Sequence, residues 1–304
     1  MADYCGDSAV KVNPGIDGEG PIVIDETAKK FVTVKYLHLA AFLFFLVQAI
    51  GYGAAGGDLQ VSPTAGFAGY CNSKIYPYPT CYGVWDTSPQ LNIYKSINPI
   101  WLMTFFIVLA GFDHLVSFII CYKYESYAKW WLYVAGSNPL RWIEYSVSAS
   151  VMAWAISILC GIQDVHLWFL IFFMNAVGML LGQVIEALPK QDVDANEKQP
   201  FKFSSIRLGV WILAAINIFV PWLVMLCYFF KATSSPDADV PEFVYIAFLG
   251  TLVMFITFGV NSYLHNILNW YDFETAEIVY ISLSFTAKTI LAADVLGGLR
   301  AAGN

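Results

Sequence analysis

Seven long apolar runs limit what this chain can fold into. Each holds about 20 residues or more, the length of an α-helix that crosses the hydrocarbon core of a bilayer, and each is too long for a β-strand. A helix satisfies its own backbone hydrogen bonds, as a lipid environment requires. The sequence therefore predicts an all-α membrane protein, a bundle of seven transmembrane helices in one domain. The runs cover about residues 31–53, 98–120, 138–160, 165–188, 204–230, 242–268 and 277–299.

Composition agrees with a membrane protein. Of the 304 residues, 58% are hydrophobic and 13% are charged, whereas a soluble domain carries about 25% charged residues. The sequence has no basic patch, which argues against nucleic acid as a partner. The first 30 residues are polar and acidic and lack the apolar segment of a cleavable signal peptide. We expect an acidic tail over residues 1–30, a helical domain over 31–300 and a C-terminal tail over 301–304.

Basic residues outside the runs predict the orientation of the bundle. Seven crossings put the two termini on opposite sides of the membrane. The side of the N-terminus holds eight basic residues and the other side holds four, and cytoplasmic loops carry the excess of Lys and Arg. We therefore expect a cytoplasmic N-terminus and an extracellular C-terminus. The eight are Lys11, Lys29, Lys30, Lys123, Lys129, Lys190, Lys198 and Lys202, and the four are Lys74, Lys95, Lys231 and Arg300.

The long connection over residues 54–97 is extracellular in this topology. It alternates aromatic residues with turn residues, a pattern that predicts a short β-hairpin. It also contains Cys71 and Cys81, and two extracellular cysteines can form a disulfide. Two free thiols remain the alternative.

Lys288 lies in the middle of the last apolar run. It follows Glu277 by 11 residues and precedes Arg300 by 12, so about 16 Å of helix separates it from either end. A lysine side chain reaches only about 6 Å and cannot bring its ammonium to the interface. A lone charge at this depth costs several kcal/mol. Lys288 must therefore be paired, neutralised or chemically modified.

Other ionisable residues fall inside the runs near the same depth. In the expected topology, His38, His114 and Glu144 lie on three helices, on the cytoplasmic side of Lys288. Such residues usually face the interior of a bundle. Asp113 is next to His114, but adjacent positions on a helix diverge by about 100°, so we expect one of the two to face the interior.

Glu144 is the predicted partner of Lys288. Arg141 and Ser148, at i−3 and i+4 from Glu144, share its helical face, and Ser284 is at i−4 from Lys288. Three roles are open for the pair on these residues alone. It is a structural ion pair, an ion-coupling pair in a transporter, or a lysine that forms a Schiff base with an aldehyde and needs an anionic counterion.

Two segments make the pattern recognisable. Asn138-Pro-Leu-Arg-Trp-Ile-Glu-Tyr-Ser-Val-Ser-Ala-Ser150 and Tyr280-Ile-Ser-Leu-Ser-Phe-Thr-Ala-Lys288 closely resemble the third and seventh helices of heliorhodopsins. These are retinal-binding photoreceptors whose membrane orientation is inverted relative to ordinary microbial rhodopsins. The resemblance extends through all seven helices in order and implies a bundle of rhodopsin type. The cytoplasmic N-terminus inferred from the basic residues agrees with it.

The resemblance also implies roles for individual residues. Lys288 would bind all-trans retinal as a protonated Schiff base, with Glu144 as its counterion. A homodimer and an unidentified signalling partner are further expectations. Ser148, Ser284 and Arg141 would form the hydrogen-bond network of the Schiff base, while His38, His114 and Glu186 would form a polar cavity that accepts its proton. The residues that would line the retinal pocket are Met174, Asn175, Gly178, Trp211 and Phe255.

Three functions follow, none of them enzymatic. The leading one is a light sensor that stores the Schiff-base proton on the cytoplasmic side without pumping ions. The alternative is a light-gated or light-driven proton conductor that uses Glu144 and Asp294, because Asp294 lies about 9 Å beyond Lys288 toward the outer face. A transporter without retinal, with Glu144 and Lys288 as a coupling pair, is less favoured. The sequence lacks metal-ligand spacing, a nucleophile–base set and a phosphate loop.

Overall fold

The computed structural model describes residues 22–55, 98–130, 135–188, 206–234 and 240–302. Within these ranges seven helices are long and apolar enough to cross a membrane, and no β-strand is present. The predicted all-α bundle of seven membrane helices is therefore confirmed for this part of the chain. The helices are α1 (Ile22–Ala55), α2 (Pro99–Lys123), the short α3 (Glu125–Lys129), α4 (Pro139–Leu159), α5 (Val165–Ala187), α6 (Ile206–Thr233), α7 (Glu242–Asn266) and α8 (Phe273–Ala302).

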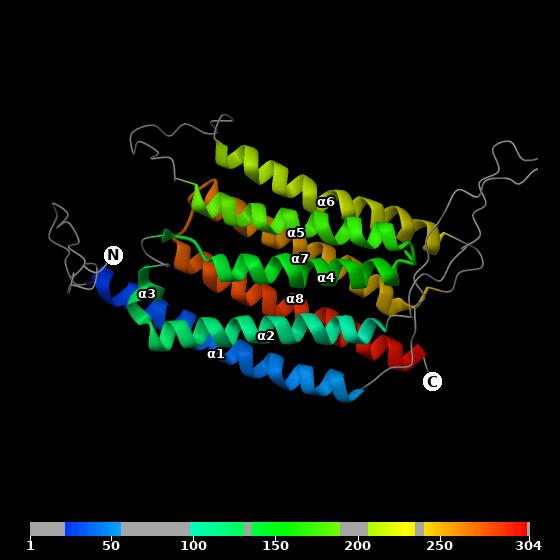
Figure 1. Ribbon diagram of the computed structural model, residues 1–304, viewed down its shortest axis with the longest axis horizontal. Coiled ribbons are helices and arrows are strands. Elements are labelled where there is room, and N and C mark those ends of the chain that lie inside the picture. Colours follow the sequence, from blue (N-terminus) through cyan, green and yellow to red (C-terminus); the bar gives the residue numbers. More distant parts are fainter. Residues whose placement is uncertain (1–21, 56–97, 131–134, 189–205, 235–239, 303–304) are drawn as a thin grey trace, which may run out of the picture.

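The long helices run side by side, and the start of α1 and the end of α8 lie at opposite ends of the bundle (Figure 1). Helices that follow one another along the chain pack together, and α1 closes the ring against α8. Most of α4 is buried, because α2, α5 and α7 all pack against it. We call the end of the bundle that holds Lys29 and Asp272 the N-side, and the end that holds Asn98 and Gly298 the C-side.

Two membrane helices begin at an Asn-Pro sequence. Asn98 Oδ1 accepts a hydrogen bond from the Ile100 N–H at 2.9 Å, and Asn138 Oδ1 accepts one from the Arg141 N–H at 3.3 Å. These side chains satisfy N–H groups that have no partner within the first turn, and proline in the first helical position costs no hydrogen bond. The Asn138 cap thereby fixes the start of α4, the helix that carries Glu144.

The helix ends differ from those expected. α1 begins at Ile22 and α8 at Phe273, so both extend beyond their apolar runs. Apolar length marks the part of a helix inside the bilayer, whereas polar residues can continue the same helix into water. The expected tail over residues 1–30 therefore overlaps α1. The predicted β-hairpin in the 54–97 connection lies outside the described residues, as do Cys71 and Cys81.

Candidate functional site

Lys288 of α8 meets Glu144 of α4 inside the bundle. Lys288 Nζ donates a hydrogen bond to Glu144 Oε1 at 2.7 Å, and each side chain is 4% exposed. The Tyr145 ring lies beside them, with its centroid 5.3 Å from Lys288 Nζ. Opposite charges at this distance attract by roughly 6 kcal/mol at an effective dielectric constant of about 20, which offsets much of the cost of burying them. The structure thus brings together the two residues that the sequence predicts to pair.

A small cavity of about 30 Å³ adjoins this ion pair. The Oγ atoms of Ser148 and Ser284, which line it with Lys288, are buried and lack a hydrogen-bond partner among the described residues. Leaving a buried hydroxyl unpaired costs about 1–3 kcal/mol, so the wall of this cavity suits a further polar atom next to Lys288 Nζ. The rest of the lining is apolar or aromatic: Tyr145, Ala149, Met152, Met179, Phe255, Phe258 and Ala287.

His38 of α1 and His114 of α2 form a buried pair. Their Nδ1 atoms are 2.9 Å apart, and the residues are 3% and 5% exposed. For this contact to be a hydrogen bond, one ring must donate its Nδ1 proton and the other must accept it. Phe45 stacks on His114 at a centroid distance of 5.6 Å. The two histidines therefore share one proton and retain ring nitrogens that can take up another.

Arg141 differs from the expectation. The sequence assigns it to the network of Lys288, but its guanidinium instead lies between two other carboxylates, with Nη1 on Glu277 of α8 and Nη2 on Glu186 of α5. All three side chains are buried. The Lys288 side chain leans toward the start of its own helix and meets Glu144, so two ion pairs are stacked along the α4–α8 interface. We call Arg141, Glu186 and Glu277 the arginine cluster.

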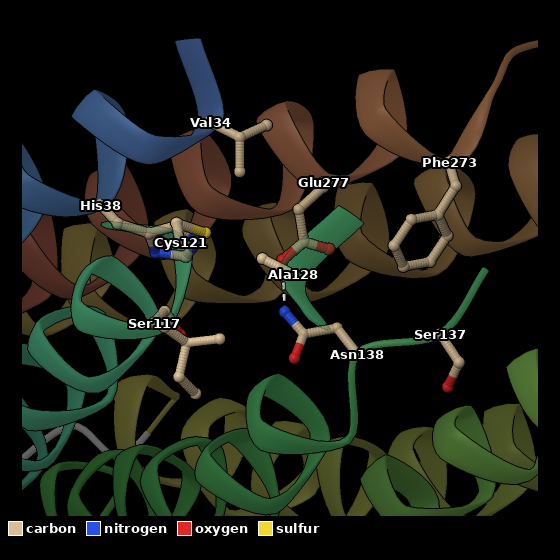
Figure 2. A pocket seen from close by; sticks show the side chains of 10 residues that line it. Val34, His38, Ser117, Cys121, Ala128, Ser137, Asn138, Phe273 and Glu277 are labelled. Atoms are coloured by element: carbon tan, nitrogen blue, oxygen red, sulfur yellow. Dashed lines mark hydrogen bonds between the residues drawn. The ribbon is translucent and has the colours of Figure 1, made fainter. Parts of the chain in front are cut away.

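Asn138, the N-cap of α4, ties the arginine cluster to the rest of the N-side. Its backbone N–H donates to Glu186 Oε2 at 3.1 Å, and its Nδ2 donates to Glu277 Oε1 at 2.7 Å. Figure 2 shows the Asn138 amide pointing at the Glu277 carboxylate. A cavity of about 20 Å³ lies here, lined by Asn138, Glu277, Ser117 and His38 among others. This space holds about one water molecule, so it can link the histidine pair to the arginine cluster.

Glu277 is the main site residue that the sequence analysis missed. It was assigned to the end of its apolar run, whereas the longer α8 places it inside the protein, 1% exposed. Two signals could have found it. Its 11-residue spacing from Lys288 is close to three full helical turns, so both residues share one face. Arg141 also needed a carboxylate partner once Glu144 was assigned to Lys288.

Asp294 lies on the C-side of Lys288. It shares a face of α8 with Leu291 and Gly298, and an added Cβ at Gly298 would meet the Phe243 ring of α7. This face therefore points toward α7. Asp294 Oδ2 is buried and has no hydrogen-bond partner among the described residues. Leu291, 1% exposed, lies between Lys288 and Asp294 along α8.

The sequence model of the Heliorhodopsin family matches residues 35–299. This stretch contains Lys288, Glu144, the histidine pair and the arginine cluster. The chain belongs to the heliorhodopsin family. Heliorhodopsins are seven-helix membrane proteins that bind retinal and sense light, so the resemblance found in the helices of Glu144 and Lys288 is confirmed. No curated protein matches the sequence.

The residues around Lys288 fit the retinal that a heliorhodopsin implies. A primary amine is the group that condenses with an aldehyde, and the buried hydroxyls of Ser148 and Ser284 lie beside it. The remaining wall is apolar and aromatic, as a polyene requires. The cavity of about 30 Å³ is smaller than such a ligand. The flexible side chains of Met152 and Met179 are the parts of the lining best able to give way.

The predicted pocket residues of this heliorhodopsin on α6 and α7 differ in position. Phe255 lines the cavity beside Lys288 and packs on Trp222, with ring centroids 5.1 Å apart. Trp211 does not line this cavity and packs instead on Tyr263, at a centroid distance of 5.0 Å. Helical spacing does not distinguish a pocket aromatic from one that packs between two helices.

The predicted pocket residues on α5 lie behind that wall. Asn175 is fully buried, and its Nδ2 donates to the Ile171 carbonyl oxygen at 2.9 Å. Met174 is half-buried. A Cβ added to Gly178 would lie 2.6 Å from Ile218 Cγ1, so this glycine permits the close approach of α5 and α6. From α5, Met179 lines the cavity.

Proposed function

We propose that this heliorhodopsin is a light sensor in which Lys288 carries all-trans retinal as a protonated Schiff base and Glu144 is the counterion. The observation that carries the proposal is the buried Lys288–Glu144 pair beside a cavity lined by the buried hydroxyls of Ser148 and Ser284. Retinal supplies a light-absorbing polyene and, after condensing with the Lys288 amine and releasing water, a positively charged imine nitrogen.

Each neighbour of Lys288 has a task in this proposal. Glu144 accepts the hydrogen bond of the nitrogen and balances its charge, as it does for the amine at 2.7 Å. Ser148 and Ser284 offer hydroxyls that can follow the nitrogen when its direction changes. Phe255 and the other apolar lining residues exclude water, which strengthens the attraction between the charges.

We infer that the proton leaving the nitrogen at Lys288 is stored on the N-side. The histidine pair offers ring nitrogens, and the 20 Å³ cavity joins His38 to Glu277. The arginine cluster holds two carboxylates against one guanidinium, so its formal charge of about −1 attracts a proton. A proton kept in this closed network leaves slowly, which suits a sensor whose signal must last. We propose that the N-side faces the cytoplasm. A tag at the N-terminus should then react with a membrane-impermeant label only after the cells are opened.

The test is reconstitution with all-trans retinal. Membranes should become coloured, and Lys288→Ala should abolish the colour, whereas the matched change Lys35→Ala should keep it. Glu144→Gln should move the absorption to longer wavelength, because a weaker anion stabilises the positive charge at Lys288 less. An unshifted spectrum would give the counterion role to another group. Colourless membranes would refute the proposal and leave Lys288–Glu144 as a transporter coupling pair.

One observation favours a second function, light-dependent proton conduction. Asp294 Oδ2 is buried on the C-side of Lys288 and has no hydrogen-bond partner in the described part of the chain, so titratable groups lie on both sides of the nitrogen. Conduction predicts a sustained photocurrent under voltage clamp that disappears in Glu144→Gln and Asp294→Asn. A pigment that bleaches and recovers without current would exclude it.

The output of the sensor requires a partner. We propose that movement of the helices is passed to an unidentified signalling protein by a homodimer. The outer faces of α5 and α6 offer apolar surface for the second copy, including Phe173 and Leu223, 58% and 59% exposed. Cross-linking of single cysteines on these faces in native membranes tests the dimer, and an absence of cross-links would contradict it.

A further inference from the structure

We propose that Asp113 of α2 is a second carboxylate of the site, placed so that it shares with Glu144 the task of balancing the positive charge at Lys288. The position of Asp113 beside Glu144 and Lys288 does not depend on a bound ligand. The effect of Asp113 on the absorption spectrum rests on the proposed retinal function.

Asp113 lies near the depth of Lys288 Nζ along the bundle. Phe45 of α1 stacks on His114 and also contacts Phe285, at a centroid distance of 5.9 Å. His114 and Phe285 therefore pack on the same ring, which puts them at similar depths. Phe285 precedes Lys288 by about 4.5 Å of helix, and a lysine side chain leans toward the start of its helix. Lys288 Nζ thus lies near the depth of residues 113 and 114.

The second step is the direction in which Asp113 points. His114 faces α1, where it meets His38 and Phe45. Asp113 is rotated from it by about 100° and shares a face with Ser117, one turn farther along. Ser117 is buried and lines the N-side cavity together with His38 of α1, Asn138, the N-cap of α4, and Glu277 of α8. The face of Asp113 therefore points into the bundle.

The third step is the charge around Asp113. The charged groups close enough to act on its carboxylate are Glu144, Lys288 and Arg141. Arg141 is already engaged by Glu186 and Glu277, which leaves one cation for two carboxylates. Like charges repel strongly in a low-dielectric interior, so one ionised carboxylate suffices to balance Lys288 and the second is held in reserve.

This arrangement gives Lys288 a second carboxylate that can balance its positive charge. When Glu144 is neutralised, Asp113 can ionise and balance the charge from a greater distance. The Schiff base of the Glu144→Gln variant should then stay protonated at neutral pH, and its pigment should absorb at longer wavelength than that of the wild type. When both carboxylates are neutralised, the nitrogen at Lys288 has no anion and should lose its proton, which moves the absorption to the near ultraviolet.

The experiment compares Asp113→Asn, Glu144→Gln and the double variant, each reconstituted with retinal at neutral pH. The matched control is Asp294→Asn, the same change at a carboxylate on the C-side, alone and combined with Glu144→Gln. We expect Asp113→Asn/Glu144→Gln to lose its visible band and Asp294→Asn/Glu144→Gln to keep the band of Glu144→Gln. A visible band in the Asp113 double variant equal to that of Glu144→Gln would overturn the proposal.

A second measurement uses the retinal-free protein and does not depend on pigment formation. The melting temperature of the double variant should fall by at least about 4 °C more than the sum of the two single losses. In a Lys288→Met background, where no cation needs balancing, Asp113→Asn should cause no loss. If Asp113→Asn lowers the melting temperature equally in both backgrounds, Asp113 does not act on Lys288. If no variant forms pigment but the loss caused by Asp113→Asn disappears in the Lys288→Met background, the retinal function fails and the placement of Asp113 stands.

Discussion

The arginine cluster makes the sharpest prediction about what holds the bundle together. Arg141 joins α4 to α5 and α8 through hydrogen bonds to Glu186 and Glu277, with all three side chains buried. Arg141→Gln removes two charge-assisted hydrogen bonds, each contributing about 1.5–3 kcal/mol, and leaves two carboxylates facing each other. Loss of one member of a buried ion pair costs about 3–5 kcal/mol. We therefore expect Arg141→Gln to lose at least about 3 kcal/mol of unfolding free energy.

The assay is thermal unfolding of the retinal-free protein in detergent, with two further variants as controls. Arg141→Lys keeps the charge, but an ammonium cannot reach two carboxylates with the forked geometry of a guanidinium, so it should restore stability only in part. The triple variant Arg141→Met, Glu186→Gln, Glu277→Gln removes every charge and should be more stable than Arg141→Gln. If Arg141→Gln melts within about 2 °C of wild type, or if the triple variant is the least stable, the electrostatic account of the cluster is wrong.

Three other predictions use the same melting assay. Gly182→Ala should cost about 1–3 kcal/mol, because its new methyl group would overlap the buried Trp142 ring, whereas Gly209→Ala, which meets nothing within 4 Å, should cost nothing. Arg207→Gln should lower the free energy of unfolding by about 3 kcal/mol. Arg207 Nε donates to the Ile185 carbonyl oxygen and Nη1 to the Asn266 carbonyl oxygen, each at 3.0 Å, near the ends of α5 and α7. An unchanged melting temperature would refute this prediction. Partial burial raises the pKa of Asp272, but hydrogen bonds from Lys30 and Thr275 outweigh it, so the pKa of this carboxyl lies below its usual value. The ionised Asp272 carboxylate thus contributes to the free energy of unfolding above its unfolded pKa of about 3.9. This contribution is lost as pH falls through the lower folded pKa. Because the Lys30 and Asp272 side chains are partly exposed, Asp272→Asn should lower the free energy of unfolding by less than about 1 kcal/mol at pH 7 and leave it unchanged at about pH 2. An equal loss at both pH values would contradict the assignment.

Much of the fold was predictable because a bilayer leaves the chain few choices. Apolar length gave the seven membrane helices, and the depth of Lys288 forced a partner, for which helical spacing selected Glu144. The ends of α1 and α8 were not predictable in this way. Hydropathy falls where a helix leaves the lipid, and the backbone can stay helical beyond that point. The error at the start of α8 is what concealed Glu277.

The partners of Arg141 show a second limit. Sequence spacing placed Arg141 on the face of Glu144, and that is correct for α4 alone. Its partners were decided by the depth at which α5 and α8 present carboxylates, which depends on how each helix is shifted along its axis. Such shifts are set by packing contacts, for example the Trp142 ring against Gly182. A single sequence carries little information about them, and the same limit explains Trp211.

The polar groups are distributed unequally about Lys288, and this bears on the choice between storing and conducting a proton. On the N-side, the histidine pair, a cavity of about 20 Å³ and the arginine cluster follow one another with room for a water molecule between them. On the C-side, Asp294 shares its helical face with Leu291, a buried apolar residue that lies between Lys288 and Asp294 along α8. A proton that leaves Lys288 therefore has a polar route in one direction and an apolar barrier in the other. Storage needs only the first, whereas conduction needs Leu291 to move. Leu291→Ser should then raise any photocurrent, while in a pure sensor it should change the recovery rate without producing current.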